Sequence, residues 1–126
     1  MSSPTTIILY GIPNCDTVKK ARAWLQEQGL PYQFHDFKKQ GVPADRLAGW
    51  MAAVGWDRLL NRQGTTWRRL DAAVQARVQD AASAAALMRE QPSVIKRPVV
   101  EWDGMPTGRV TVGFQAEAWS DLAHRA

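Results

Sequence analysis

The chain has 126 residues, 45% of them apolar, which suits a single globular domain with its own hydrophobic core. A single cysteine excludes an internal disulfide framework, and no C-x-x-C pair or His/Cys cluster has zinc-ligand spacing, so we expect no bound metal or cofactor. No apolar run is long enough to cross a membrane, and residues 1–6 are too few and too polar for a signal peptide. We therefore expect one cytoplasmic domain over residues 1–126, without a membrane partner.

The net charge of +4 and the pI near 9.6 raise the question of nucleic-acid binding. The basic residues are dispersed along the chain, with Lys38-Lys39 and Arg68-Arg69 as isolated pairs. No segment joins a basic stripe to a nucleic-acid motif. An anion-attracting cleft explains the charge more simply than nucleic acid as a partner does.

The cysteine, Cys15, lies where a predicted strand leads into a predicted helix. Residues 6–9 are rich in β-branched side chains, a turn with glycine and proline follows, and apolar positions at helical spacing begin at Val18. Unpaired N–H groups and the helix dipole favour a thiolate at such a position. Lys19, one turn along, would add a second stabilising charge. We interpret Cys15 as a nucleophile, although a free cysteine can also be a small buried apolar side chain.

The first helix is expected to end near Gly29, before a second strand over residues 32–37. A β-α-β unit of this size favours parallel strands. His35, on the second strand, is expected to make a structural hydrogen bond rather than to catalyse. His124 is close to the C-terminus and is given no role.

Residues 43–91 have a helical pattern that we interpret as an insert covering one end of a small sheet. Its first helix ends at Gly55, and another is expected over residues 80–91. Residues 99–102 and 110–112 predict a hairpin around Asp103-Gly104, and residues 114–122 a final helix. The order predicts an α/β, thioredoxin-like fold with a helical insertion between a β-α-β unit and a C-terminal β-β-α unit. The apolar stripe of the insert's first helix consists of Leu47, Trp50, Met51 and Val54.

A proline at the entry to a core strand, Pro98, is the second informative feature. Such a proline marks an edge, a first strand residue or a cis peptide bond. A cis Arg97–Pro98 bond would turn the preceding backbone toward Cys15, where its N–H and C=O groups could bind an extended peptide such as glutathione. Arg97 would then provide an anion contact beside the sulfur, although it could also be an exposed arginine before a strand.

Four motifs follow one another along the chain: YGIPNCDT (10–17), LNRQGTT (60–66), IKRPVV (95–100) and VGF (112–114). With these motifs the chain resembles the arsenate reductase (ArsC) family over about residues 6–122, most closely its YffB branch, with the Spx transcription regulators as neighbours. The resemblance implies a thioredoxin-like fold with a helical insert, a nucleophilic Cys15 and a cis proline at Pro98.

Two departures from the family pattern bear on activity. Glutaredoxin-coupled arsenate reductases resemble the chain at Cys15 and Arg97, but have arginines at the positions of Asn61 and Gly113. Arg62 could replace the first of these arginines, and no neighbouring residue replaces the second. Spx-type redox sensors commonly have a C-x-x-C pair, whereas the third residue after Cys15 is not a cysteine, so no intramolecular disulfide can form.

The leading hypothesis is a glutathione-dependent thiol oxidoreductase with Cys15 as nucleophile and Lys19 lowering its pKa. Arg97, Pro98 and Arg62 would bind substrate or anionic groups. The expected partners are glutathione as co-substrate, a protein or small-molecule disulfide, and a glutaredoxin. The alternatives are a Spx-like adaptor that binds RNA polymerase through the insert, and an arsenate reductase.

Overall fold

The computed structural model describes residues 7–102 and 109–124, and the chain divides into two compact units. The first unit comprises Met1–Asp36 and Arg97–Ala126, and the second comprises Phe37–Lys96. The expected insert, residues 43–91, lies within the second unit. The Asp103-Gly104 turn of the expected hairpin lies outside the described residues.

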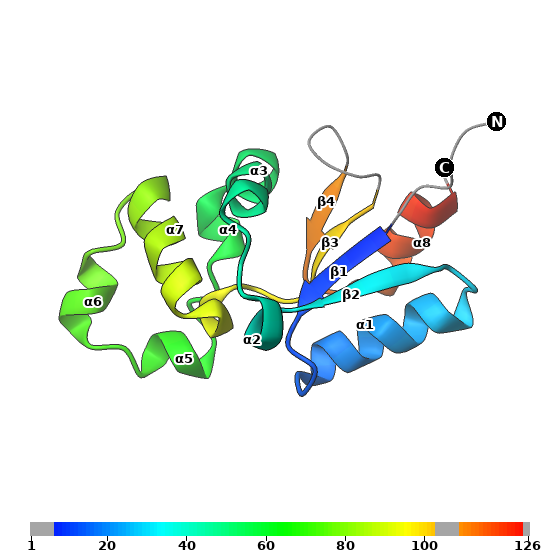
Figure 1. Ribbon diagram of the computed structural model, residues 1–126, viewed down its shortest axis with the longest axis horizontal. Coiled ribbons are helices and arrows are strands. Elements are labelled where there is room, and N and C mark those ends of the chain that lie inside the picture. The colour runs from blue at the N-terminus through cyan, green and yellow to red at the C-terminus, as the bar shows by residue number, and fades with distance from the viewer. Residues whose placement is uncertain (1–6, 103–108, 125–126) are drawn as a thin grey trace. The chain divides into compact units, whose positions relative to one another are not determined.

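A four-stranded sheet in the order β2-β1-β3-β4 organises the first unit. As expected for a β-α-β unit, β1 and β2 pair in parallel, whereas β3 pairs antiparallel to both β1 and β4 (Figure 1). The order of elements confirms the thioredoxin-like fold. The elements of this unit are β1 (Ile7–Gly11), α1 (Asp16–Glu27), β2 (Tyr32–Asp36), β3 (Val99–Glu101), β4 (Val110–Val112) and α8 (Ala116–His124).

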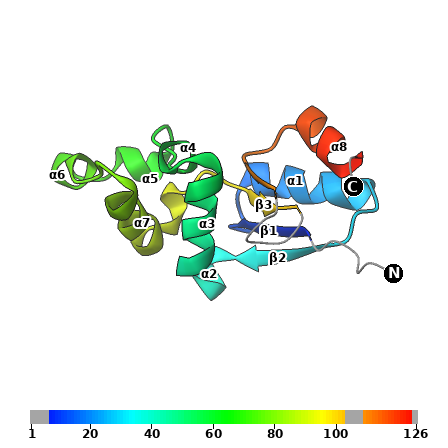
Figure 2. The same ribbon diagram turned by 90° about the horizontal axis from the view of Figure 1, so that it is seen from above.

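The core of the first unit lies on one face of the sheet, which α1 and α8 cover together (Figure 2). Alternate strand residues such as Leu9 and Val100 are fully buried there, as the period of two in a strand requires. Trp119 of α8 packs edge-on against Trp102, with their ring centroids 5.0 Å apart. The apolar stripe of α1 completes this core with Val18, Ala21 and Leu25.

Local residues explain the structure at both ends of α1. At its C-terminus, Gly29 adopts a φ of 68°, and the N–H groups of Gly29 and Leu30 bond back to the carbonyls of Gln26 and Leu25. This Schellman motif confirms the predicted stop. At its N-terminus, Gly11 allows β1 to approach the helix closely, because a Cβ at this position would lie 2.8 Å from Val18 Cγ2.

The second unit is helical throughout its described elements. The expected helix-stopping role of Gly55 is confirmed, since it adopts a φ of 90° directly after α3. Leu47 and Trp50 of the expected stripe are buried, whereas Met51 and Val54 are half-buried. The elements are α2 (Phe37–Gln40), α3 (Ala44–Val54), α4 (Trp56–Leu59), α5 (Thr65–Arg68), α6 (Ala72–Ala76), α7 (Ala81–Glu90) and a 3-10 turn (Pro92–Val94).

Two segments of the second unit are tied together by their backbones. Leu60 and Ile95 form an isolated antiparallel bridge. The N–H of Asn61 donates to the carbonyl of Val94 at 2.7 Å, and the N–H of Lys96 donates to the carbonyl of Leu59 at 2.8 Å. The segment after α4 is therefore fixed against the end of the unit. None of the helices in the described ranges is long and apolar enough to cross a bilayer.

Candidate functional site

Cys15 occupies the N-cap position of α1, in the extended conformation with φ −90° and ψ 126°. Its N–H donates to the carbonyl of Ile12 at 3.2 Å, and its own carbonyl accepts the first helical hydrogen bond, from the N–H of Lys19 at 2.9 Å. The side chain is half-buried against the core of the first unit. The predicted strand–turn–cysteine–helix arrangement is confirmed, and the thiol lies at the edge of the core.

The surroundings of Cys15 hold the pKa of its thiol below the usual value. Partial burial by itself raises this pKa, but the N–H of Val18, the side chain of Arg97 and the N–H of Thr17 outweigh it. Arg97 acts both as a hydrogen-bond donor and as a positive charge. The sulfur makes no cap hydrogen bond of ordinary geometry, yet the two N–H groups at the start of α1 still stabilise negative charge on it.

Arg97, which lies two residues before β3, reaches the thiol. The Arg97–Pro98 bond is cis, as predicted. Arg97 is half-buried, and Pro98 is buried, with its carbonyl accepting from the N–H of Gly113 at 2.9 Å. This bond occupies the Pro98 carbonyl within the sheet. The structure therefore brings Cys15 and Arg97 together at the ends of β1 and β3, while a substrate contact by Pro98 stays a prediction.

The remaining predicted site residues lie in different surroundings. Lys19 is exposed on α1, and its effect on the thiolate stays a prediction. Arg62 belongs to the second unit, where its guanidinium carbon lies 5.5 Å from the ring centroid of Trp56 and 5.8 Å from that of Trp67. Arg62 thus has two aromatic neighbours, and anion binding by its side chain stays a prediction.

His35 is part of an aromatic and carboxylate arrangement on the sheet. Its ring lies 4.8 Å from that of Tyr10, the residue opposite it in the parallel register. The Tyr10 hydroxyl donates to Glu101 Oε1 at 3.1 Å, and Glu101 is fully buried. His35 thus packs against Tyr10, and the hydrogen bond expected of it stays a prediction. Within the described ranges, no group of three or more His, Cys, Asp or Glu side chains could hold a metal ion.

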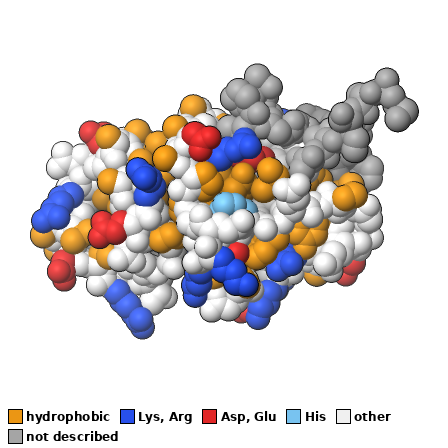
Figure 3. Space-filling view, in the orientation of Figure 1, with side chains coloured by type: hydrophobic (Ala, Val, Ile, Leu, Met, Phe, Trp, Pro, Cys, Tyr) orange, Lys and Arg blue, Asp and Glu red, His pale blue; other side chains and the backbone are white. Residues whose placement is uncertain are grey.

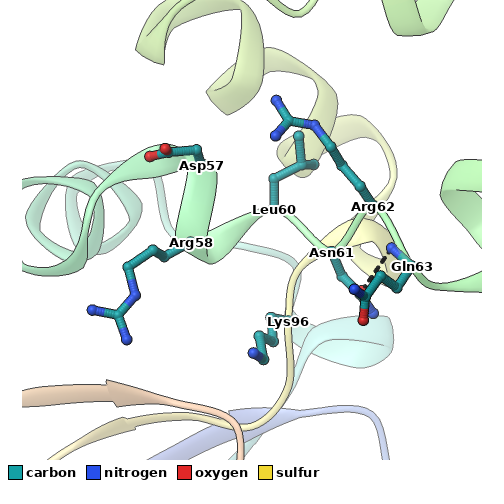
Figure 4. A pocket seen from close by; sticks show the side chains of 7 residues that line it. All are labelled: Asp57, Arg58, Leu60, Asn61, Arg62, Gln63 and Lys96. Atoms are coloured by element: carbon teal, nitrogen blue, oxygen red, sulfur yellow. Dashed lines mark hydrogen bonds between the residues drawn. The ribbon is translucent and has the colours of Figure 1, made fainter.

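Sequence reasoning anticipated N–H groups at the start of the helix, and Thr17 and Val18 provide them as its second and third residues. It missed one feature of the second unit. The basic residues Arg58 and Lys96 line a pocket of the second unit together with Arg62 (Figure 4). No local sequence pattern signals this pocket, since its two segments are 33 residues apart in the chain.

Comparison with known proteins agrees with this architecture. The model of the ArsC family matches residues 10–122. The solved structure of a protein named YffB is 48% identical, with a TM-score of 0.84, and the match covers 92% of this chain and 97% of that one. An uncharacterized protein of Haemophilus influenzae is 37% identical over 90% of this chain and 95% of its own length.

A transcriptional regulator is also similar to the chain. The global transcriptional regulator Spx of Staphylococcus saprophyticus is 25% identical over 88% of this chain and 82% of its own length. The family match covers the end of β1, the helix that Cys15 caps, the second unit and the Arg97–Pro98 segment. The chain belongs to the ArsC family.

Proposed function

We propose that the protein is a glutathione-dependent thiol oxidoreductase that works through Cys15 alone. One observation carries the proposal: a half-buried thiol at the N-cap of α1 accepts a hydrogen bond from Arg97, and its pKa is lowered. A lowered pKa increases the thiolate fraction near neutral pH, and the thiolate is the reactive form of cysteine. Partial exposure leaves the sulfur open to attack a substrate.

The proposed reaction consists of two thiol–disulfide exchanges. In the first, the Cys15 thiolate attacks the glutathione sulfur of a glutathionylated substrate, an S–S bond forms between Cys15 and glutathione as the substrate–glutathione S–S bond breaks, and the substrate leaves as a thiolate. In the second, the thiolate of a free glutathione attacks that mixed disulfide and releases the Cys15 thiolate together with oxidised glutathione. In the net exchange the substrate sulfur is reduced to a thiol, and the sulfur of the free glutathione is oxidised as it enters the disulfide of oxidised glutathione.

In this scheme Arg97 stabilises the Cys15 thiolate both before attack and as a leaving group. Its positive charge would also attract the carboxylates of glutathione to the sulfur. Lys19 is proposed to add a weaker field from the exposed face of α1. Pro98 and Arg62 are proposed as further contacts to the peptide or its anionic groups, and a glutaredoxin could replace glutathione in the second exchange.

Incubation with oxidised glutathione, followed by intact-protein mass spectrometry, tests the proposal. We expect one glutathione per chain, removed by free thiol, and none on the Cys15→Ser variant. Arg97→Ala should slow adduct formation with glutathione more than with neutral 2-hydroxyethyl disulfide, because only glutathione carries carboxylates. An unmodified wild-type protein, or equal losses for the charged and neutral disulfides, would contradict the proposed site.

Similarity to Spx favours a second candidate, an adaptor that binds RNA polymerase through the second unit. The residue three positions after Cys15 is Val18, so a disulfide switch within this site cannot regulate such an adaptor. A pull-down with the C-terminal domain of the polymerase α subunit distinguishes the two candidates. Capture that persists in Cys15→Ser, together with no glutathione adduct on wild type, would favour the adaptor.

Membership of the ArsC family makes arsenate reduction the third candidate. Asn61 and Gly113 occupy the positions at which the resemblance places arginines in glutaredoxin-coupled arsenate reductases. Fewer positive charges would bind an arsenate oxyanion more weakly. An assay for arsenite formation with glutathione and glutaredoxin is therefore expected to show little activity, and sustained turnover would replace the thiol oxidoreductase proposal.

A further inference from the structure

A pocket of about 260 Å³ opens on the second unit and is separate in its lining from Cys15 and Arg97. Its volume lies just below the usual range for drug-sized ligands, so it suits a small ligand. Most of its lining side chains are charged or carry amides: Asp57, Arg58, Asn61, Arg62, Gln63 and Lys96.

The backbone that carries this lining is firmly connected. The Leu60–Ile95 bridge and the two hydrogen bonds next to it, Asn61 to Val94 and Lys96 to Leu59, join the segment after α4 to the end of the unit. Inside the segment, Asn61 Oδ1 accepts from the N–H of Gln63 at 3.1 Å. Basic side chains from two distant parts of the chain are therefore anchored on one rigid backbone frame.

Figure 4 shows how the charged side chains lie. In this view Arg58 and Lys96 extend downward, Arg62 extends upward, and Asp57 extends to the left above Arg58. Among the described residues, Arg58 and Lys96 form no salt bridge. One side of the pocket thus presents two positive charges, and Asp57 is directed away from them.

The charge of the whole second unit agrees with this local excess. Residues 37–96 contain ten Lys and Arg against five Asp and Glu, whereas the rest of the chain contains six against seven. On the face shown in Figure 3, the basic side chains lie in separate groups with neutral surface between them. The field of the unit attracts anions, and the pocket is where two cations and two side-chain amides are held on one frame.

We propose that this pocket binds a compact phosphate dianion, with Arg58 and Lys96 as its charged contacts. The guanidinium of Arg58 can pair with two oxygens at once, and the ammonium of Lys96 acts as a point charge. The two positive charges match the two negative charges of the ligand. The site goes beyond the proposed thiol chemistry, and either can hold without the other.

Arg62 has a supporting part in the proposal. Its guanidinium is flanked by Trp56 and Trp67, so it adds positive potential at the rim without extending toward Arg58 and Lys96. The indole N–H signals of these two tryptophans provide convenient reporters close to the pocket.

Titration of the ¹⁵N-labelled full chain with inorganic phosphate at constant ionic strength tests the proposal. We expect saturable shifts confined to the amides of residues 57–63 and 96 and to the two indole signals. The double variant Arg58→Gln with Lys96→Gln should weaken binding about tenfold or more, since it removes two charged contacts. The control, Arg77→Gln with Arg89→Gln, removes the same charge from exposed positions of the same unit outside the pocket, and should retain wild-type affinity.

Two further comparisons identify the ligand class. The pocket lining contains no histidine or cysteine, so binding that strengthens from about pH 5.5 to about pH 8 reports the second ionisation of phosphate. Succinate, a dicarboxylate of the same charge, should bind more weakly. Shifts that never saturate, equal weakening in the control variant, or succinate binding as tightly as phosphate would overturn the proposal. Glutathione adduct formation on Cys15, measured on the same variants, reports the thiol site independently.

Discussion

At the scale of single residues, the thiol of Cys15 is controlled by opposing effects of its surroundings. Half-burial against the core raises its pKa, while the start of α1 and Arg97 lower it further than burial raises it. The balance depends on an arginine that is 82 residues away in the chain and reaches the sulfur from the entry to β3. Arg97 is therefore the side chain whose replacement should change the chemistry of Cys15 most.

Replacing Arg97 by alanine should raise the pKa of Cys15, because both a charged hydrogen bond and a positive charge are lost. At a pH below both midpoints the thiolate fraction should fall about tenfold or more. Thiolate absorbance in the ultraviolet, followed against pH, measures the change. Arg97→Lys keeps the charge, so its titration midpoint should lie between those of wild type and Arg97→Ala. A midpoint in Arg97→Ala equal to that of wild type would be inconsistent with this role.

Replacing Lys19 by alanine should have a smaller effect in the same direction. Lys19 is exposed, so solvent screens its charge, and about a twofold fall in thiolate fraction is expected. The same absorbance titration measures it, with Lys20→Ala as a control of equal charge on the neighbouring exposed position. Equal effects of Lys19→Ala and Lys20→Ala would show that the thiolate responds to the overall positive charge of the helix surface and not to Lys19 in particular.

At the scale of elements, the position of Cys15 depends on how closely β1 packs against α1. Gly11 lies at the end of the strand, and the first turn of the helix reaches into the space where its Cβ would be. Small shifts of α1 would move the N-cap and with it the thiol. The glycine is thus a packing requirement of the strand–helix junction.

Gly11→Ala should lower the free energy of unfolding by roughly 1–3 kcal/mol through overpacking against Val18. The double variant Gly11→Ala with Val18→Ala relieves the contact, so its loss should be less than the sum of the two single losses. Urea denaturation of the four proteins completes the cycle. Strictly additive losses would show that the Val18 contact is not the cause.

The second unit offers a separate test of core packing. Trp50 of α3 is fully buried, with its ring centroid 6.2 Å from that of Phe37, so Trp50→Ala should cost about 3–5 kcal/mol in the free energy of unfolding. Denaturation midpoints of Trp50→Ala and of the milder Trp50→Phe measure the loss. An unchanged midpoint combined with lost polymerase binding would favour the adaptor function instead.

At the scale of the whole molecule, the ionisation of Cys15 links its chemistry to stability. Its pKa is lower in the folded chain than in the unfolded chain, because the start of α1 and Arg97 stabilise the thiolate. Its contribution to stability is therefore complete above the unfolded pKa and is lost as the pH falls through the folded pKa. The stability of wild type relative to Cys15→Ser should therefore rise as the pH increases from the folded pKa to the unfolded pKa. Urea midpoints of both proteins under reducing conditions measure this, and a difference that falls with rising pH would contradict the lowered pKa.

Local sequence determined most of the first unit. β-Branched residues before a turn, a glycine able to adopt positive φ, and a period of two or 3.6 are local signals, and they predicted β1, α1 with its stop at Gly29, β2 and the N-terminal position of Cys15. The stop of α3 at Gly55 and the burial of Leu47 and Trp50 followed from the same kind of pattern. These features depend on neighbouring residues and on the backbone geometry that those residues favour, so they can be inferred directly from the sequence.

Only the tertiary structure decided which distant groups meet. The proximity of Arg97 to Cys15 was inferred from the position of Arg97 before a strand and from the family resemblance. The lowering of the Cys15 pKa by Arg97, however, depends on a contact between side chains that are 82 residues apart in the chain. The neighbours of Arg62 and the pocket of Arg58 and Lys96 had no sequence signal, because side chains around a bridge such as Leu60–Ile95 come from segments with no shared periodicity. The sequence alone was enough to predict the local secondary structure and the nucleophile Cys15. The electrostatic interactions of each charged side chain depend on distances through space, and these are set only when the chain folds.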